Sequence, residues 1–275
     1  MKSRQFRLVA MDMDDTFLCR DKSISTANMQ AVKDAISSGI TIVPASGRAF
    51  SMLPREIRNC PGIRYFITAN GARVRDFQDN RYLYSNLILY DTVLSLLDLE
   101  EAYGLIPEVC LEEVFYISEA DEDNECCFYD PSLAWFVRSM HTKVPSLREE
   151  VLHRRIGSEK MLAFFPDVSK MDAFRLEAED RFHVTVSTSV PGEFEITASG
   201  VSKGTALMAL CEKLGIDRRE TLAMGDSGND EAMLRSAGFS VAMGNSDDSL
   251  ISFSDFITDD CDNDGFAKAI YRFVL

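Results

Sequence analysis

Two aspartates and a threonine, Asp12, Asp14 and Thr16, stand two residues apart at the end of an apolar run near the start of the chain. Side chains at i and i+2 of an extended strand share one face, so the two carboxylates are expected to start out pointing the same way. Two crowded negative charges are costly unless a positive group lies beside them, and a hard divalent cation such as Mg²⁺ is the simplest candidate. One carboxylate could then attack an electrophile while the other transfers protons. The alternative is a polar turn after a strand, because Asp is common in turns.

Three further polar clusters follow apolar runs or begin helices. Ser46-Gly47-Arg48 offers a hydroxyl and an exposed amide to an anion. Ser202-Lys203-Gly204 puts a cation at a helix start, and Gly225-Asp226-Ser227-Gly228-Asn229-Asp230 can supply metal ligands without crowding. Taken singly, each cluster could be an ordinary cap, a solvated lysine or a plain loop. Ligands gather at the carboxyl ends of strands in open α/β sheets, so the four clusters together predict one catalytic site.

Short apolar runs alternate with amphipathic stretches at both ends of the chain. The predicted strands are 6–11, 40–44, 65–68, 221–224, 240–243 and 256–258. The predicted helices are 26–38, 49–59, 203–214, 230–237 and 265–275, and a hairpin is predicted over 73–84. This alternation predicts an α/β fold with a doubly wound parallel sheet, that is, a Rossmann-like core.

The middle of the chain has a different character. Predicted helices over 91–103 and 170–180 and strands over 162–165 and 184–187 indicate an α+β unit inserted into the first fold. The predicted organisation is a core domain over 1–84 and 198–275 with a cap domain over 85–197. The acidic run over 119–125 is predicted to be a solvated loop.

Length, charge and cysteine content limit the classes of partner. At 275 residues the chain is long enough for two domains. The net charge of −15 argues against nucleic acid or an anionic membrane surface as the main partner. Seven cysteines without metal-type spacing predict free thiols in a reducing cytosol. The first apolar stretch is interrupted by Asp12, which argues against a signal peptide or a membrane span and favours a cytoplasmic protein.

The four clusters, in this order, resemble the motifs of the haloacid dehalogenase superfamily. Within it they are similar to the Cof-type phosphatases, which carry a large α/β cap between the second and third motifs. That pattern is Asp-x-Asp-x-Thr, Thr/Ser-Gly-Arg, a helix-opening Lys-Gly and Gly-Asp-x-x-Asn-Asp. Asn70-Gly71-Ala72 and Val241-Ala242-Met243-Gly244-Asn245 also resemble this subfamily.

The resemblance implies a role for each carboxylate. Asp12 would be the nucleophile that forms an aspartyl-phosphate. Asp14 would protonate the leaving oxygen and then take a proton from the attacking water. Mg²⁺ would be held by the Asp12 carboxylate, the Asp14 backbone carbonyl and Asp226. Asp230 would support the metal or Lys203.

The resemblance also implies the groups that bind phosphate. Ser46, the Gly47 amide and Lys203 would bind the phosphoryl oxygens. Asn229 would contact the phosphate or a metal-bound water. Arg48 has two open interpretations, a contact with substrate or a pair with a core carboxylate. Cys261 departs from the pattern, because relatives commonly have Asn there, and this puts any side-chain contact from that position in doubt.

The implied activity is a Mg²⁺-dependent phosphatase acting on a small phosphorylated metabolite, with a sugar phosphate as the first expectation. One alternative is a phosphomutase of hexose phosphates, whose products would be isomers instead of free phosphate. The other is a non-enzymatic phosphate-sensing regulator similar to a response-regulator receiver. Receivers are much shorter and would not explain the inserted middle segment.

Overall fold

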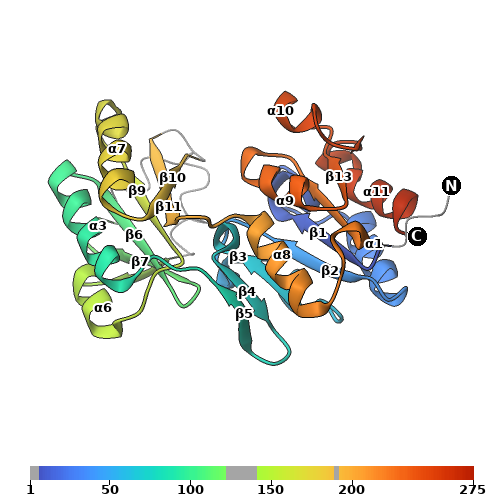
Figure 1. The fold of residues 1–275 in the computed structure, drawn as a ribbon, viewed down its shortest axis with the longest axis horizontal. Helices are drawn as coiled ribbons and strands as arrows, with labels where there is room; N and C mark the ends of the chain where they lie inside the picture. The colour runs from blue at the N-terminus through green and yellow to red at the C-terminus, as the bar shows by residue number, and fades with distance from the viewer. Residues whose placement is uncertain (1–5, 122–140, 189–191) are drawn as a thin grey trace. The chain divides into compact units, whose positions relative to one another are not determined.

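The computed structural model describes residues 6–121, 141–188 and 192–275, which divide into two compact units (Figure 1). Unit 1 comprises Met1–Arg48, Leu53–Ser85 and Ser202–Leu275. Unit 2 comprises Ala49–Met52 and Asn86–Val201. The division of the chain into a core and a cap domain stays a prediction. The short stretch Ala49–Met52 was not expected to belong to the second unit.

Unit 1 is built on an eight-stranded sheet within the described residues. Its strands, from one edge to the other, are β14 (Phe256–Ile257), β13 (Phe239–Ala242), β12 (Thr221–Gly225), β1 (Leu8–Asp12), β2 (Thr41–Ala45), β3 (Tyr65–Thr68), β4 (Arg73–Asp76) and β5 (Arg81–Ser85). The first six run parallel, and β4 and β5 add an antiparallel hairpin at one edge. The central strand β1 is buried throughout, as expected for a parallel strand covered on both faces.

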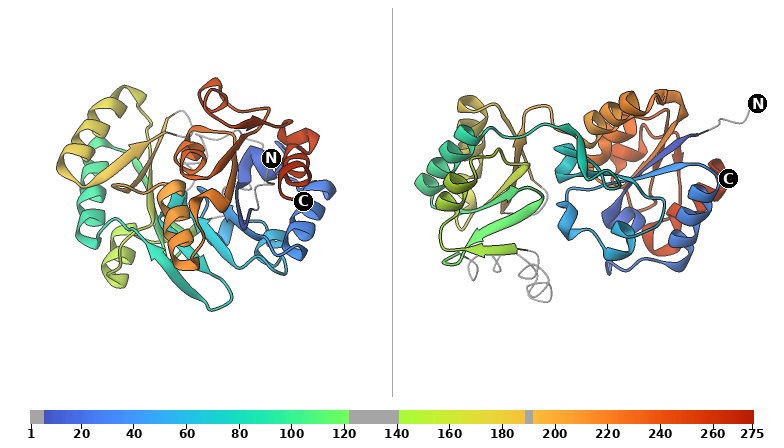
Figure 2. Two further views of the ribbon diagram at one scale, coloured as in Figure 1. Left: turned by 45° about the vertical axis from the view of Figure 1, so that its right-hand side comes forward. Right: turned by 90° about the horizontal axis from the view of Figure 1, so that it is seen from below.

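Helices cover both faces of this sheet. One face packs against α8 (Lys203–Leu214) and α9 (Glu231–Ser236), whose apolar residues join Leu8 and Ala10 of β1 in one cluster. The helices α1 (Thr26–Ser37) and α11 (Gly265–Phe273) pair with each other on the opposite face (Figure 2, right). The predicted doubly wound α/β core is confirmed.

The helix predicted over 49–59 is wrong. Instead of a helix over 49–59, the chain forms a 3-10 turn at Phe50–Met52 and the single α-helical turn α2 (Arg55–Arg58). Pro54 separates the two, because proline has no amide N–H to donate and disfavours the helical conformation of the preceding residue. A short helix α10 (Asp248–Ile251), which was not predicted, follows β13.

Unit 2 is an α+β sandwich, which confirms the predicted class of the insertion. Its six-stranded sheet has the order β10 (Val184–Ser187), β11 (Glu193–Ala198), β9 (Lys160–Phe164), β6 (Ile106–Leu111), β7 (Val114–Ser118) and β8 (His141–Val144). The helices α3 (Tyr90–Tyr103), α6 (Leu147–Arg154) and α7 (Met171–Arg181) cover one face (Figure 1). Phe165, Phe174 and Phe194 pack edge-to-face or stacked in the core between them.

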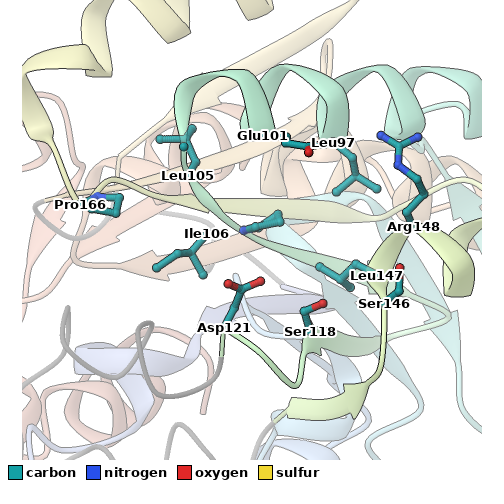
Figure 3. A pocket seen from close by; sticks show the side chains of 12 residues that line it. Leu97, Glu101, Leu105, Ile106, Ser118, Asp121, Ser146, Leu147, Arg148 and Pro166 are labelled. Carbon is teal, nitrogen blue, oxygen red and sulfur yellow. The ribbon is translucent and has the colours of Figure 1, made fainter.

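A cavity of about 1020 Å³ lies at the ends of α3, β6 and α6 in unit 2 (Figure 3). Its lining mixes apolar side chains with charged ones, among them Leu97, Glu101, Leu105, Leu147 and Arg148. None of the predicted site residues lines it. The acidic run predicted as a loop begins in a turn near this cavity and extends beyond residue 121, outside the described residues.

None of the described helices combines the length and the apolar character that crossing a membrane requires.

Candidate active site

The register of two adjacent parallel strands brings the predicted metal carboxylates together. Met11 of β1 lies opposite Met224 of β12, so Asp12 and Asp226 follow at neighbouring strand ends. Asp230 joins them from the 3-10 turn that comes next. One carboxylate oxygen from each of Asp12, Asp226 and Asp230 lies within 4.8 Å of the others.

Asp230 is held in place by the turn in which it lies. Its Oδ2 accepts hydrogen bonds from the backbone amides of Asp226 at 3.0 Å and Ser227 at 3.2 Å. Gly225 makes this approach possible, because a Cβ atom at that position would lie 2.5 Å from the Asp230 side chain. Glycine at position 225 therefore has a steric reason.

Lys203 connects three of the four motifs. It is the first residue of α8 and its side chain is 1% exposed. Its Nζ donates to Asp12 Oδ1 at 2.5 Å, to Asp230 Oδ1 at 2.7 Å and to Asn229 Oδ1 at 3.2 Å. Three acceptors satisfy the three N–H groups of the ammonium, so the alternative of a solvated lysine is wrong.

The cluster holds more negative charge than Lys203 balances. Burial, together with Asp230 and Asp226, raises the pKa of Asp12 well above its usual value, although Lys203 opposes this. Burial and Asp230 raise the pKa of Asp226 to about 6. Burial alone would lower the pKa of Lys203, but Asp12 and Asp230 outweigh it and raise that pKa. Buried carboxylate oxygens with excess negative charge fit a hard divalent cation.

Asp14 does not join this cluster with its side chain. The extended backbone ends at Asp12, and Asp15 takes a left-handed conformation with φ of 57°, so the i, i+2 rule no longer applies. Asp14 instead accepts from Arg48 Nε at 2.8 Å and from the Arg48 terminal nitrogen at 2.5 Å, with Lys22 Nζ at 3.4 Å. Burial would raise the pKa of Asp14, but the hydrogen bonds and charges of Arg48 and Lys22 outweigh it and lower that pKa. Arg48 was expected to contact either substrate or a core carboxylate, and in the structure it pairs with the carboxylate of Asp14.

The predicted phosphate-binding residues lie on the strand beside β1. Asp12 pairs with Ala45 of β2, so Ser46 and Gly47 follow next to the end of β1. Ser46 is 1% exposed, and its Oγ accepts from the amide of Arg48 at 3.1 Å. These residues therefore lie with Asp12 at the carboxyl ends of the parallel strands.

Three residues at this edge were not predicted as site residues. Lys22 donates to Asp15 at 3.0 Å, Asn70 lies against Gly47, and Asn245 donates to the backbone carbonyl of Asp15 at 2.8 Å. Asn70 and Asn245 stand in sequence patterns that resemble the subfamily, which is a usable signal. No sequence pattern predicts a role for Lys22, because its contact with Asp15 depends on how the chain folds back after β1.

Comparison with known proteins gives one consistent family. A family model described as haloacid dehalogenase-like hydrolase matches residues 9–270. The chain is 30% identical over 273 residues to the 5-amino-6-(5-phospho-D-ribitylamino)uracil phosphatase YcsE of Bacillus subtilis, covering 98% of this chain and 96% of that protein. It is 29% identical to a putative phosphatase of Streptococcus pyogenes, with 98% of each chain covered.

Solved structures agree with this result. A haloacid dehalogenase-like hydrolase from Bacillus subtilis superposes with a TM-score of 0.82 at 28% identity, covering 98% of this chain and all of that one (100%). A Thermotoga maritima protein superposes with a TM-score of 0.84 at 25% identity, with 98% of each chain covered. The chain therefore belongs to the haloacid dehalogenase-like hydrolases, and within them to the Cof-type phosphatases.

Proposed function

We propose that the chain is a Mg²⁺-dependent phosphatase that hydrolyses a small phosphorylated metabolite of the sugar-phosphate class through an aspartyl-phosphate on Asp12. The observation that carries the proposal is the contact of the buried Asp12 with Lys203 at 2.5 Å, beside Asp226. A nucleophile, a phosphate-binding cation and a metal-binding carboxylate then lie together. We further propose 1–84 and 198–275 as the catalytic core, 85–197 as the cap, and the cytoplasm as the compartment.

Two carboxylates of the cluster are available to a metal ion. Both oxygens of Asp230 already accept hydrogen bonds from Lys203 or backbone amides, which favours a supporting role. Asp12 and Asp226, with the Asp14 carbonyl, are then the proposed ligands. A bound divalent cation would neutralise the carboxylates and polarise a phosphoryl oxygen.

The proposed reaction has two steps that share one proton-transfer group. An Asp12 oxygen attacks phosphorus, and the bond from phosphorus to the leaving oxygen breaks as that oxygen takes a proton from Asp14. Water then gives a proton to Asp14 while its oxygen attacks phosphorus and the bond to Asp12 breaks. The products are an alcohol and inorganic phosphate, and both side chains are restored.

Groups around Asp12 would bind the charge that builds on the phosphoryl oxygens. Lys203 is the first residue of α8, and Ser46 and Gly47 follow β2, which supports the proposal that they bind these oxygens. The lowered pKa of Asp14 favours its carboxylate form while Arg48 is paired with it. The acid step therefore requires this pair to open, and a substrate phosphate is the group that would attract Arg48 away.

The relatives support the proposed class of substrate. The Bacillus subtilis relative YcsE is named for a substrate with a phosphorylated ribityl chain. Such a chain is a sugar-derived alcohol with a terminal phosphate. We take a small phosphorylated polyol or sugar as the class of substrate for this chain.

The test is phosphate release from an aryl phosphate by the wild type and Asp12→Asn, each with and without Mg²⁺. We expect Mg²⁺-dependent release that falls by about 10³-fold or more in the variant, because the nucleophile is removed. Asp76→Asn is the matched control, since Asp76 is likewise buried and paired with a basic side chain, that of Arg64, but lies in β4. Equal turnover by the Asp12 variant, or no release by metal-loaded wild type, would refute the proposal.

A further inference from the structure

Asn245 lies in the loop after β13 and uses both ends of its side-chain amide. Its Nδ2 donates to the backbone carbonyl of Asp15 at 2.8 Å. Its Oδ1 accepts from the backbone amide of Cys261 at 3.0 Å. Two hydrogen bonds of opposite sense determine the orientation of the amide.

The carbonyl that Asn245 holds belongs to a strained turn. Asp15 has φ of 57°, a left-handed conformation that is unfavourable for a residue with a Cβ atom and that hydrogen bonds from neighbouring segments can stabilise. The next residue, Thr16, donates from Oγ1 to Asp226 Oδ1 at 2.9 Å. The held peptide thus leads directly into a contact with a proposed metal ligand.

The same loop also holds the turn that carries Asp226. The amide of Met243 donates to the carbonyl of Gly225 at 3.1 Å, and Ser246 Oγ donates to the same carbonyl at 3.3 Å. The amide of Asp247 lies 3.4 Å from the carbonyl of Asp226. Residues 243–247 therefore contact the turns after both β1 and β12.

The C-terminal segment anchors this loop in turn. The amide of Gly244 donates to the carbonyl of Asp259 at 3.2 Å, and a Cβ at position 244 would lie 2.8 Å from the amide nitrogen of Asp260. Cys261 contacts Asn245 through its backbone amide, so this contact does not depend on which side chain stands at position 261.

We propose that Asn245 is a positioning residue that holds the Asp12–Thr16 turn in register with Asp226 and thereby sets the affinity of the site for a divalent cation. The inference rests on the proposed function, because it assigns a metal to Asp12 and Asp226. Loss of a residue that hydrogen-bonds directly to a metal ligand typically weakens metal binding about 10–100-fold. Asn245 acts one residue further away, through the carbonyl of Asp15, so we expect its effect at the lower end of that range.

The test is the dissociation constant of Mg²⁺, measured by calorimetry for the wild type and Asn245→Ala. We expect binding about 10-fold weaker in the variant. Phosphate release should require more Mg²⁺ and return toward the wild-type rate at saturation. Thr221→Ala is the matched control, because Thr221 Oγ1 also bridges a backbone carbonyl, that of Arg218 at 2.6 Å, and a backbone amide, that of Gly238 at 3.1 Å, but at the opposite end of β12 from Asp226. It should lose stability and keep its affinity for Mg²⁺.

A second variant covers the case in which Asn245→Ala does not fold. Asn245→Asp keeps an acceptor for the Cys261 amide but has no donor for the Asp15 carbonyl. Its added negative charge by itself favours a cation, so weaker Mg²⁺ binding would identify the lost donor as the cause.

The outcomes separate the inference from the function on which it rests. Unchanged Mg²⁺ affinity in the Asn245 variants, or equal weakening in Thr221→Ala, overturns the inference while an active, Mg²⁺-binding wild type leaves the function standing. A wild type that neither binds Mg²⁺ nor releases phosphate overturns the proposed function and the inference with it.

Discussion

A single buried ammonium group organises the polar residues at the end of β1. Lys203 reaches Asp12, Asn229 and Asp230, which come from two separate motifs. Removing one partner of such a buried pair leaves a charge without compensation, which typically costs about 3–5 kcal/mol. The stability and the proposed chemistry of this edge therefore depend on the same side chain.

A different buried carboxylate, that of Glu100 in α3, has no such partner within the part of the chain that the structure describes. It is fully buried, and neither carboxylate oxygen has a hydrogen-bond partner among the described residues. Burial raises its pKa well above the usual value of 4.5. A raised folded-state pKa means that the full stability is present below the unfolded pKa and is lost as pH rises through the folded one.

We therefore expect Glu100→Gln to stabilise the protein at pH 8 by about 1–2 kcal/mol and to make little difference near pH 4. Urea unfolding at the two pH values measures this. Glu101→Gln, at the exposed neighbouring position, should change neither value. A Glu100 variant that is less stable than wild type at pH 8 would show that the carboxylate is charged and paired in solution.

At the scale of the element, the start of α8 determines where Lys203 points. Ser202 caps the helix: its Oγ accepts from the amide of Thr205 at 3.0 Å, while Thr205 Oγ1 accepts from the amide of Ser202 at 3.0 Å. This reciprocal capping box satisfies two otherwise unpaired amides. Because Lys203 is the next residue, the cap also orients its backbone.

We expect Ser202→Ala to cost about 1 kcal/mol of stability and to lower kcat for the aryl phosphate, because Lys203 then sits on a frayed turn. Ser25→Ala is the control, since Ser25 caps α1 in the same way by accepting from Asn28 at 3.0 Å. Its stability loss should be similar and its kcat unchanged. Equal kcat losses in both variants would assign the effect to global destabilisation.

At the scale of the whole molecule, negative charge is concentrated as well as abundant. The chain carries a net charge of −15, and one unit gathers Asp12, Asp226 and Asp230 within 4.8 Å. A folded-state pKa of about 6 for Asp226 means that its ionised form destabilises the fold above that pH. A cation that binds only the folded state would reverse this by mass action.

We expect Asp226→Asn to be more stable than wild type at pH 8 in a chelator and less stable than wild type in saturating Mg²⁺. Mg²⁺ at 100 times its dissociation constant should stabilise the wild type by about 2.7 kcal/mol. Thermal unfolding with and without Mg²⁺ measures which of the two proteins is more stable in each condition. Asp76→Asn should be destabilised in both conditions, because Arg64 lowers the pKa of Asp76. A wild-type midpoint that does not respond to Mg²⁺ would contradict the expectation.

The sequence by itself determined the fold class, the order of most elements and the four motifs. Periodicity carries that information, because a strand buried on both faces, such as Leu8–Asp12, reads as a continuous apolar run. Local steric signals also determine where a helix is interrupted. The helix expected over 49–59 does not form as one element, because Pro54 separates its two halves. The type and spacing of the Asp and Lys residues sufficed to indicate a site at one sheet edge.

Only the tertiary structure decided how those residues pair. The contacts of the buried Lys203, the pairing of Asp14 with Arg48 and the bridge made by Asn245 join residues that are 16 to 230 positions apart. Such contacts depend on strand register and on the left-handed turn at Asp15, and neither follows from composition or periodicity. A hydrogen bond needs placement to within a few tenths of an ångström, which packing provides and a sequence pattern does not.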